Sequence, residues 1–146
     1  MAISIINTTE SGDQTMPVNS IHHIAISVRD LERSGLFYKD TFGFDEVQRF
    51  ERKDLGGRAV FLKLGDMRIE IWEFQNGIVP KDDPTDLKIY GMRHIAFSVT
   101  DLDKAYADLK SKIEISEPRL GASGNRYCFI SDPDGIPIEL YENRIV

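Results

Sequence analysis

The sequence contains the same unit twice. The nine residues that begin at His23 read HIAISVRDL, and those that begin at His94 read HIAFSVTDL, so seven of the nine positions agree. A second pair of matching segments is RIEIWE around Glu70 and PIELYE around Glu139. The histidines are 71 residues apart (23 to 94) and the glutamates 69 (70 to 139). Two independent segments with nearly one period indicate a tandem structural repeat.

Each unit has the pattern of a βαβββ module. An alternating run typical of a strand opens each unit, at 21–28 and at 93–99, and an Asp that can cap a helix follows it, at Asp30 and Asp101. Three more strand-like runs complete each unit: 44–50, 58–64 and 67–74, then 113–118, 125–131 and 136–141. The sequence therefore predicts an α+β fold built from two such modules.

The predicted helices follow the two Asp residues. In the second unit Leu102, Ala105, Tyr106 and Leu109 form the apolar stripe of an amphipathic helix, and in the first unit Gly43 supplies the stop. We expect a single domain at 20–146, preceded by a flexible tail at 1–19 whose isoleucines (Ile3, Ile5 and Ile6) could add an edge strand. The expected divisions are module 1 at about 20–75, a linker at 76–91 and module 2 at about 92–146.

Charge and cysteine content narrow the classes of partner. The formal net charge is −6 and no run of Lys and Arg occurs, so nucleic acids and anionic membranes are not expected partners. The single cysteine, Cys128, excludes an intrachain disulfide and suits a reducing compartment. The first nineteen residues lack the pattern of a signal peptide, and no stretch is long enough to span a membrane. We expect a cytoplasmic protein.

Strand parity brings four residues to the open faces of the modules. Side chains alternate across a strand, so His23 and His94 lie opposite the apolar neighbours that must face the helix. Glu70 and Glu139 likewise project opposite the Ile and Leu residues beside them. If each module pairs its first strand with its last, one His and one Glu lie side by side. Two open faces placed together would bring all four to one centre.

The expected centre is a site for one divalent metal ion. Imidazole and carboxylate together suit Zn, Ni, Co, Mn or Fe(II) without choosing strongly among them. Since the same residue types recur at homologous positions on the same face, a metal site is favoured over four unrelated strand residues. His22 has Arg93 as its counterpart and the wrong parity, so we expect it at the surface or behind the ligands.

Three segments resemble the vicinal oxygen chelate superfamily, which includes glyoxalase I, extradiol dioxygenases, methylmalonyl-CoA epimerase and the bleomycin and fosfomycin resistance proteins. They are HIAISVRDLERSGLFYKDTFGF, GMRHIAFSVTDLD and DPDGIPIEL, and the likeness runs from about 20 to 143. The resemblance implies that the two modules form an eight-stranded, curved mixed sheet around a metal. It places the metal ligands at His23, Glu70, His94 and Glu139.

Within this superfamily the ligand set is most similar to that of glyoxalase I. The dioxygenases and fosfomycin enzymes typically use three of these positions, and the epimerase usually has Gln where this chain has Glu70. Bacterial glyoxalase I has an Arg and an Asn that serve glutathione where this chain has Ser27 and Phe74. The resemblance therefore implies shared metal chemistry without the thiol cofactor.

The expected function is that of a metal-dependent lyase or isomerase. The metal would chelate vicinal oxygens of a small substrate, and a carboxylate would transfer the proton, with Glu139 as the preferred base and Glu70 as the second carboxylate. The alternatives are an extradiol-type dioxygenase and a non-catalytic binding or antibiotic resistance protein. We expect a homodimer, with Trp72 and Tyr141 on the pocket side, whereas either Arg126 or Tyr127 could face inward.

Overall fold

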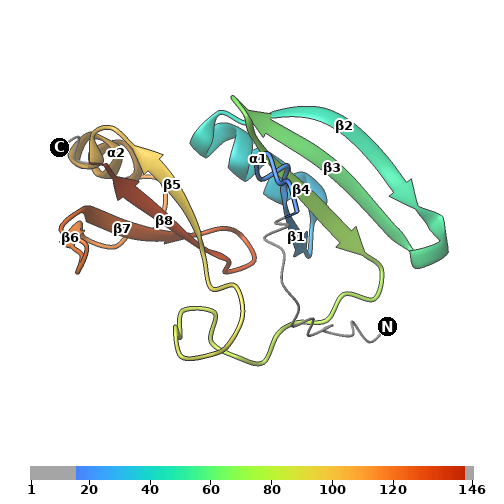
Figure 1. Ribbon diagram of the computed structural model, residues 1–146. Helices are drawn as coiled ribbons and strands as arrows, with labels where there is room; N and C mark the ends of the chain where they lie inside the picture. The colour runs from blue at the N-terminus through green and yellow to red at the C-terminus, as the bar shows by residue number, and fades with distance from the viewer. Residues whose placement is uncertain (1–15, 144–146) are drawn as a thin grey trace, which may run out of the picture.

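The computed structural model describes residues 16–143 and contains the βαβββ order twice (Figure 1). Module 1 comprises β1 (Ile24–Val28), α1 (Leu31–Phe42), β2 (Asp45–Arg52), the short 3-10 helix η1 (Lys53–Leu55), β3 (Gly57–Leu64) and β4 (Met67–Phe74). Module 2 comprises β5 (Ile95–Val99), α2 (Leu102–Leu109), β6 (Arg119–Leu120), β7 (Arg126–Ser131) and β8 (Pro137–Glu142). The edge strand considered for Ile3, Ile5 and Ile6 lies outside the described residues.

The predicted α+β fold class is confirmed, and the eight strands divide into two four-stranded mixed sheets. Their orders are β1-β4-β3-β2 and β5-β8-β7-β6. In each sheet the first strand of the module pairs in parallel with the last, and the other neighbours are antiparallel. No helix within residues 16–143 is both long and apolar enough to cross a membrane.

One predicted strand is wrong in position. The sequence pattern predicts a strand at 113–118, but β6 is a two-residue strand at Arg119–Leu120. The predicted segment contributes only an isolated bridge between Ile115 and Ile130. Pro118 has no backbone N–H to donate to a strand ladder, which interrupts pairing at this point.

Both helices begin at the predicted Asp caps. The Asp30 carboxylate accepts a hydrogen bond from the Arg33 N–H at 3.0 Å, and Asp101 accepts one from the Lys104 N–H at 2.8 Å. These bonds satisfy N–H groups that the first helical turn leaves without partners. Gly43 ends α1 with φ of 82°, a left-handed conformation that favours glycine.

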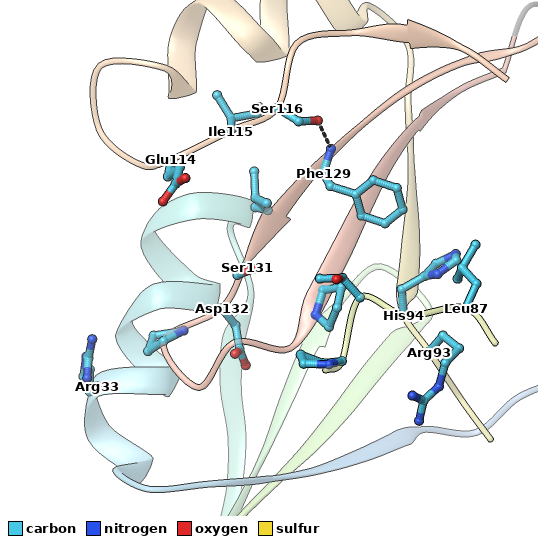
Figure 2. Close-up of a pocket in the computed structure, with 15 residues that line it drawn as sticks. Arg33, Leu87, Arg93, His94, Glu114, Ile115, Ser116, Phe129, Ser131 and Asp132 are labelled. Atoms are coloured by element: carbon cyan, nitrogen blue, oxygen red, sulfur yellow. Dashed lines mark hydrogen bonds between the residues drawn. The ribbon is translucent and has the colours of Figure 1, made fainter. Parts of the chain in front are cut away.

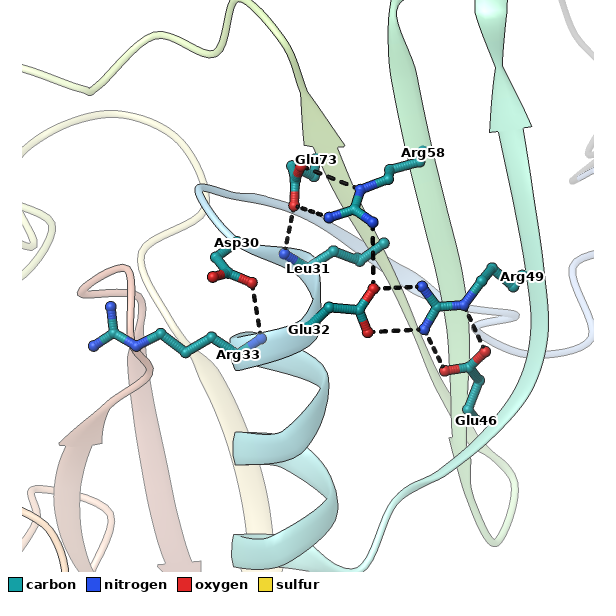
Figure 3. Close-up of polar contacts among 8 residues, drawn as sticks. All are labelled: Asp30, Leu31, Glu32, Arg33, Glu46, Arg49, Arg58 and Glu73. Atoms are coloured by element: carbon teal, nitrogen blue, oxygen red, sulfur yellow. Dashed lines mark hydrogen bonds and ion pairs between the residues drawn. The ribbon is translucent and has the colours of Figure 1, made fainter.

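A second carboxylate holds the start of α1 against the sheet (Figure 3). Glu73, on the helix side of β4, accepts a hydrogen bond from the Leu31 N–H at 2.7 Å and from Arg58 at 2.9 Å. Arg58 also contacts Glu32 in the first turn of the helix, as does Arg49. The hydrogen bond from Arg58, with that from Leu31, lowers the pKa of Glu73.

Module 2 repeats this arrangement. Glu142, 69 residues after Glu73, accepts a hydrogen bond from the Leu102 N–H at 2.9 Å. Arg126 forms an ion pair with Asp103 in the first turn of α2 and approaches Glu142 at 3.7 Å. The repeat therefore extends from the strand pattern to the polar contacts that fix each helix on its sheet.

Helix α1 packs between the two modules and joins them through one apolar core. The ring of Phe42 contacts that of Phe97 on β5 with centroids 4.9 Å apart, and Phe44 lies 5.9 Å from the same ring. The apolar faces of both sheets contribute to this core. The opposite face of each sheet, called here its open face, therefore lies outside the shared core.

A buried polar contact accompanies this packing. The Tyr38 hydroxyl donates a hydrogen bond at 3.1 Å to Asp132, in the turn between β7 and β8. Tyr38 is fully buried and Asp132 is 5% exposed. Burial raises the pKa of both side chains. The backbone N–H groups of Asp134 and Ile136 also donate to Asp132, but to its other oxygen.

We predict that Tyr38→Phe lowers the free energy of unfolding by about 1–3 kcal/mol, because it removes the hydroxyl from a buried carboxylate oxygen. The measurement is denaturant unfolding of the two proteins side by side. Tyr106→Phe is the matched control, since its hydroxyl donates to Glu117 at an exposed site, and a change within about 0.5 kcal/mol is expected there. Equal effects of the two substitutions would contradict a structural role for the buried contact.

Candidate metal centre

In module 1 the fold brings His23 beside Glu70. The parallel register sets Ala25 opposite Glu70, and His23 precedes β1 on the same face. The predicted parity is confirmed, since Ile26 and Val28 are buried whereas Ala25 is exposed. The imidazole Nε2 of His23 lies 3.5 Å from Oε2 of Glu70.

Module 2 forms the same pair. The register of β5 and β8 sets Ala96 opposite Glu139. His94 precedes β5, and its Nε2 lies 3.3 Å from Oε2 of Glu139. The two His–Glu pairs are thus equivalent in strand position, in the atoms that meet and in separation.

Both pairs have the geometry of two ligands of one ion. Two ligand atoms bound at about 2.1 Å lie about 3.0–3.4 Å apart for octahedral or tetrahedral angles. The observed 3.3 Å in module 2 falls within this range, and the 3.5 Å in module 1 lies just above it. The carboxylates are 15% and 14% exposed, and the imidazoles 35% and 30%. A mostly buried carboxylate requires a charged or hydrogen-bonding partner. The neighbouring imidazole does not use all the lone pairs of the carboxylate oxygens, so these oxygens can still bind a cation.

A single chain does not gather the four residues. Within residues 16–143 no group of three or more His, Cys, Asp and Glu side chains is arranged to hold a metal ion. The reason is the shared core: with α1 packed between the modules, the two open faces are not turned toward each other. The sequence predicted the partners within each pair. The structure adds that each chain presents the two His–Glu pairs separately, and each pair is called here a half-site.

The half-site of module 1 is surrounded by aromatic rings. Phe61 lies opposite Glu70 in the register of β3 and β4, and its ring centroid is 5.3 Å from that of His23. Trp72 lies two residues after Glu70 on the same face, as the sequence predicts. Phe50 from β2 contacts both Phe61 and Trp72.

The half-site of module 2 is more polar. Tyr141 occupies the position equivalent to Trp72, and its hydroxyl is hydrogen bonded to Ser123 at 2.7 Å and to the Asn125 amide at 3.0 Å. The sequence analysis missed Ser123 and Asn125, because they precede β7 and have no counterpart motif in module 1. The register also shows which of Arg126 and Tyr127 shares the face of the half-site: Tyr127 lies opposite Tyr141 on the open face.

His22 lies directly behind the first half-site. Its Nδ1 is 2.9 Å from Nδ1 of His23, and both residues are exposed. One imidazole must then present N–H and the other a lone pair, which limits how the His23 ring can rotate. This position agrees with the expectation that His22 supports the ligands or lies at the surface.

Cys128 takes no part in either half-site. It lies on the helix side of β7 and is fully buried. Burial raises the pKa of its thiol to about 11. A thiol that stays protonated is a poor nucleophile and a poor metal ligand.

A cavity of about 650 Å³ adjoins the second half-site (Figure 2). It extends from His94 and Phe129 to Arg33 on α1, with linker residues such as Leu87 on one side. Of the four predicted ligands, all within the described residues, His94 alone lines it. The cavity is therefore a neighbour of one half-site, and the His–Glu geometry identifies the candidate centre.

Comparison with known proteins agrees with this architecture. The model of the Glyoxalase/Bleomycin resistance protein/Dioxygenase superfamily matches residues 20–140. An uncharacterised Bacillus subtilis protein, YwkD, is 40% identical over 130 residues, covering 87% of this chain and 99% of its own. Bovine mitochondrial methylmalonyl-CoA epimerase is 30% identical over 131 residues, covering 82% and 72%. The metallothiol transferase FosB of Lysinibacillus sphaericus is 30% identical over 134 residues, covering 89% and 86%.

Solved structures give the same result. A glyoxalase family protein from Enterococcus faecalis superposes with a TM-score of 0.75 at 30% identity, covering 84% of this chain and 97% of that one. The trypanothione-dependent glyoxalase I of Leishmania major superposes with a TM-score of 0.65 at 28% identity, covering 86% and 87%. The relatives thus include an epimerase, a thiol transferase and a glyoxalase I on one fold.

Proposed function

Because the chain belongs to the Glyoxalase/Bleomycin resistance protein/Dioxygenase superfamily, we propose that it is a metal-dependent lyase or isomerase acting on a small substrate with vicinal oxygens. The observation that carries this proposal is the pair of equivalent His–Glu contacts, each with the separation of two ligands on one ion. Two carboxylates at such a centre also supply groups that can accept and return a proton.

The proposed ligands are His23, Glu70, His94 and Glu139. Two imidazoles and two carboxylates suit a divalent first-row ion such as Zn, Ni, Co, Mn or Fe(II). A divalent ion held there would act as a Lewis acid toward the adjacent oxygens of the substrate. A relative whose name includes a metallothiol activity, FosB, supports metal use within this part of the superfamily.

We infer that a second copy of the chain completes the centre. Each chain presents two half-sites on open faces outside its shared core, so the open face of module 1 is free to meet the open face of module 2 from a partner. Apolar side chains exposed on the linker and just after it would help to bury such an interface: Ile78, Val79, Leu87, Tyr90 and Met92. A twofold homodimer would then contain two equivalent centres.

Glu139 is the proposed base and Glu70 the second carboxylate. A phenylalanine lies opposite each carboxylate, Phe61 at Glu70 and Phe129 at Glu139. Only the Glu139 side adds the hydroxyl and amide groups around Tyr141, which would give it a polar path for exchanging a proton with solvent. The relative named as an epimerase carries out an isomerisation, which supports the isomerase class. Phe74, stacked on Trp72, gives no polar group for a glutathione-like thiol.

The metal proposal predicts about one ion per chain in protein purified without chelator, measured by elemental analysis. Glu70→Gln should weaken the metal affinity at least about 100-fold, since even the loss of groups behind a ligand costs 10–100-fold. Glu73→Gln is the matched control, because it lies on the same strand but faces the helix. Unchanged affinity after Glu70→Gln would remove that residue from the ligand set.

The proton-transfer proposal predicts that Glu139→Gln lowers kcat at least about 100-fold per bound ion, because a general base contributes about 10²–10⁴-fold. The assay is loss of substrate C–H signal in D₂O by NMR, with methylmalonyl-CoA and with methylglyoxal in the presence and absence of thiols. Glu117→Gln, at an exposed site bonded to Tyr106, should leave the rate unchanged. Full turnover by Glu139→Gln would exclude Glu139 as the base.

A further inference from the structure

The open faces of the two modules differ in chemistry although the strands repeat. Along β4 the open-face residues are Arg68, Glu70, Trp72 and Phe74. Along β8 they are Pro137, Glu139 and Tyr141, and Asn143 follows directly after the strand. The two faces match at the Glu and diverge on both sides of it. The proposed centre would therefore lie between two unlike surfaces.

An aromatic wall, defined here as Phe50, Phe61, Trp72 and Phe74, lies beside the module 1 half-site. Trp72 and Phe74 are stacked, with centroids 5.4 Å apart and planes 10° apart. Phe50 lies 5.3 Å from Trp72 and 5.6 Å from Phe61. All four rings are partly buried, and Phe61 continues the wall to His23.

Small residues beneath the rings make room for the wall. Phe74 lies opposite Gly57 in the register of β3 and β4, and a Cβ on Gly57 would be 2.5 Å from the Phe74 ring. Glycine at this position therefore allows the ring to lie against β3. Trp72 lies opposite Ala59 and beside Ser27, so no large side chain covers the wall from these strands.

The module 2 face has hydrogen-bonding groups where module 1 has the wall. Tyr141 replaces Trp72, Tyr127 replaces Ala59 and Asn143 replaces Phe74, according to the equivalent registers. Ser123 and Asn125 both bind the Tyr141 hydroxyl. Phe129 lies opposite Glu139 as Phe61 lies opposite Glu70, with its ring 5.4 Å from that of His94. Beyond that shared ring, this side of the proposed centre offers hydroxyl and amide contacts where module 1 has Trp72 and Phe74.

Charged side chains lie on the other side of Glu70. Arg68 and Lys63 face each other across β4 and β3, two residues before Glu70 along β4, with Asp45 opposite Lys63 on β2. The side chains between Glu70 and the end of β4 on this face are Trp72 and Phe74. On β3 and β4, Glu70 therefore separates the charged pair Arg68 and Lys63 from the aromatic wall. Arg52, on the outer strand β2, lies opposite Gly57 at the edge of the wall and is paired with Asp54.

We propose that the substrate carries a flat apolar group, such as an aromatic ring, attached next to its chelating oxygens, and that the aromatic wall receives this group. The inference rests on the proposed function, because the His–Glu pairs would fix the oxygens at the edge of the wall. Stacked rings favour a flat partner in an offset or edge-to-face arrangement. The hydroxyl and amide groups of module 2 would then contact the polar part of the substrate.

The test compares two hydroxamates, which offer the same pair of adjacent oxygens and differ in the attached group. Benzohydroxamate and acetohydroxamate are titrated into the metal-loaded, full-length protein by calorimetry. Trp72 is the single tryptophan of the chain, so quenching of its fluorescence reports binding at the wall independently. Burying a phenyl group predicts at least about tenfold tighter binding of benzohydroxamate, with strong quenching.

The repeat supplies the variant that tests the wall. Trp72→Tyr with Phe74→Asn gives module 1 the residues of module 2, and the affinity ratio of the two hydroxamates should fall at least about fivefold. Phe50→Leu, on the outer strand β2, is a second variant that keeps Trp72 and should also reduce the ratio. Phe37→Leu is the matched control, because it removes an aromatic ring from α1 rather than from the wall, and it should leave the ratio unchanged.

The outcomes separate this inference from the proposed function. Equal binding of both hydroxamates, or a ratio that persists in both wall variants, would overturn the aromatic substrate while leaving metal chelation intact. If neither hydroxamate binds to protein that holds its metal, the proposed function is overturned, and this inference with it. A ratio above about tenfold that falls in the wall variants alone supports both.

Discussion

The packing of helix α1 between the two modules determines where every candidate ligand lies. Phe42 and Phe44 meet Phe97 of the other module, and the buried Tyr38–Asp132 hydrogen bond fixes the same contact. Since both sheets direct their apolar faces to this core, their open faces lie outside it. Each chain therefore forms two His–Glu pairs, and a complete four-ligand centre requires another arrangement of modules, for which a second copy is the simplest source.

The partners within each half-site could be predicted from sequence because they depend on local rules. Alternation along a strand and the pairing of first and last strands were enough to bring His23 to Glu70. The relation between the modules could not be predicted, because it depends on contacts between distant residues with no distinctive pattern. Asp132 has the sequence pattern of an ordinary turn residue, and its bond to Tyr38 is evident only in the fold. The misplaced strand at 113–118 reflects apolar alternation that Pro118 interrupts.

The repeat is retained on the helix side of each sheet, whereas on the open side the His–Glu pair recurs and the residues beyond it differ. On the helix side, Glu73 and Glu142 hold the first turns of α1 and α2 in the same way. On the open side, Trp72 and Tyr141 occupy equivalent positions with different chemistry. This division is expected if the helix side supports the fold, which both modules need, and the open side contacts a substrate whose two ends differ.

The central claim, a centre shared between module 1 of one chain and module 2 of another, is tested most directly by subunit complementation. His23→Ala and His94→Ala proteins are mixed under conditions that exchange subunits, and tightly bound metal is measured. Random exchange makes half of the dimers mixed, and each mixed dimer carries one intact centre out of two. About a quarter of the native metal content should therefore return. Mixing His23→Ala with Glu70→Gln, both in module 1, should restore none. Absence of recovery in the first mixture, once exchange is verified, would contradict the shared centre.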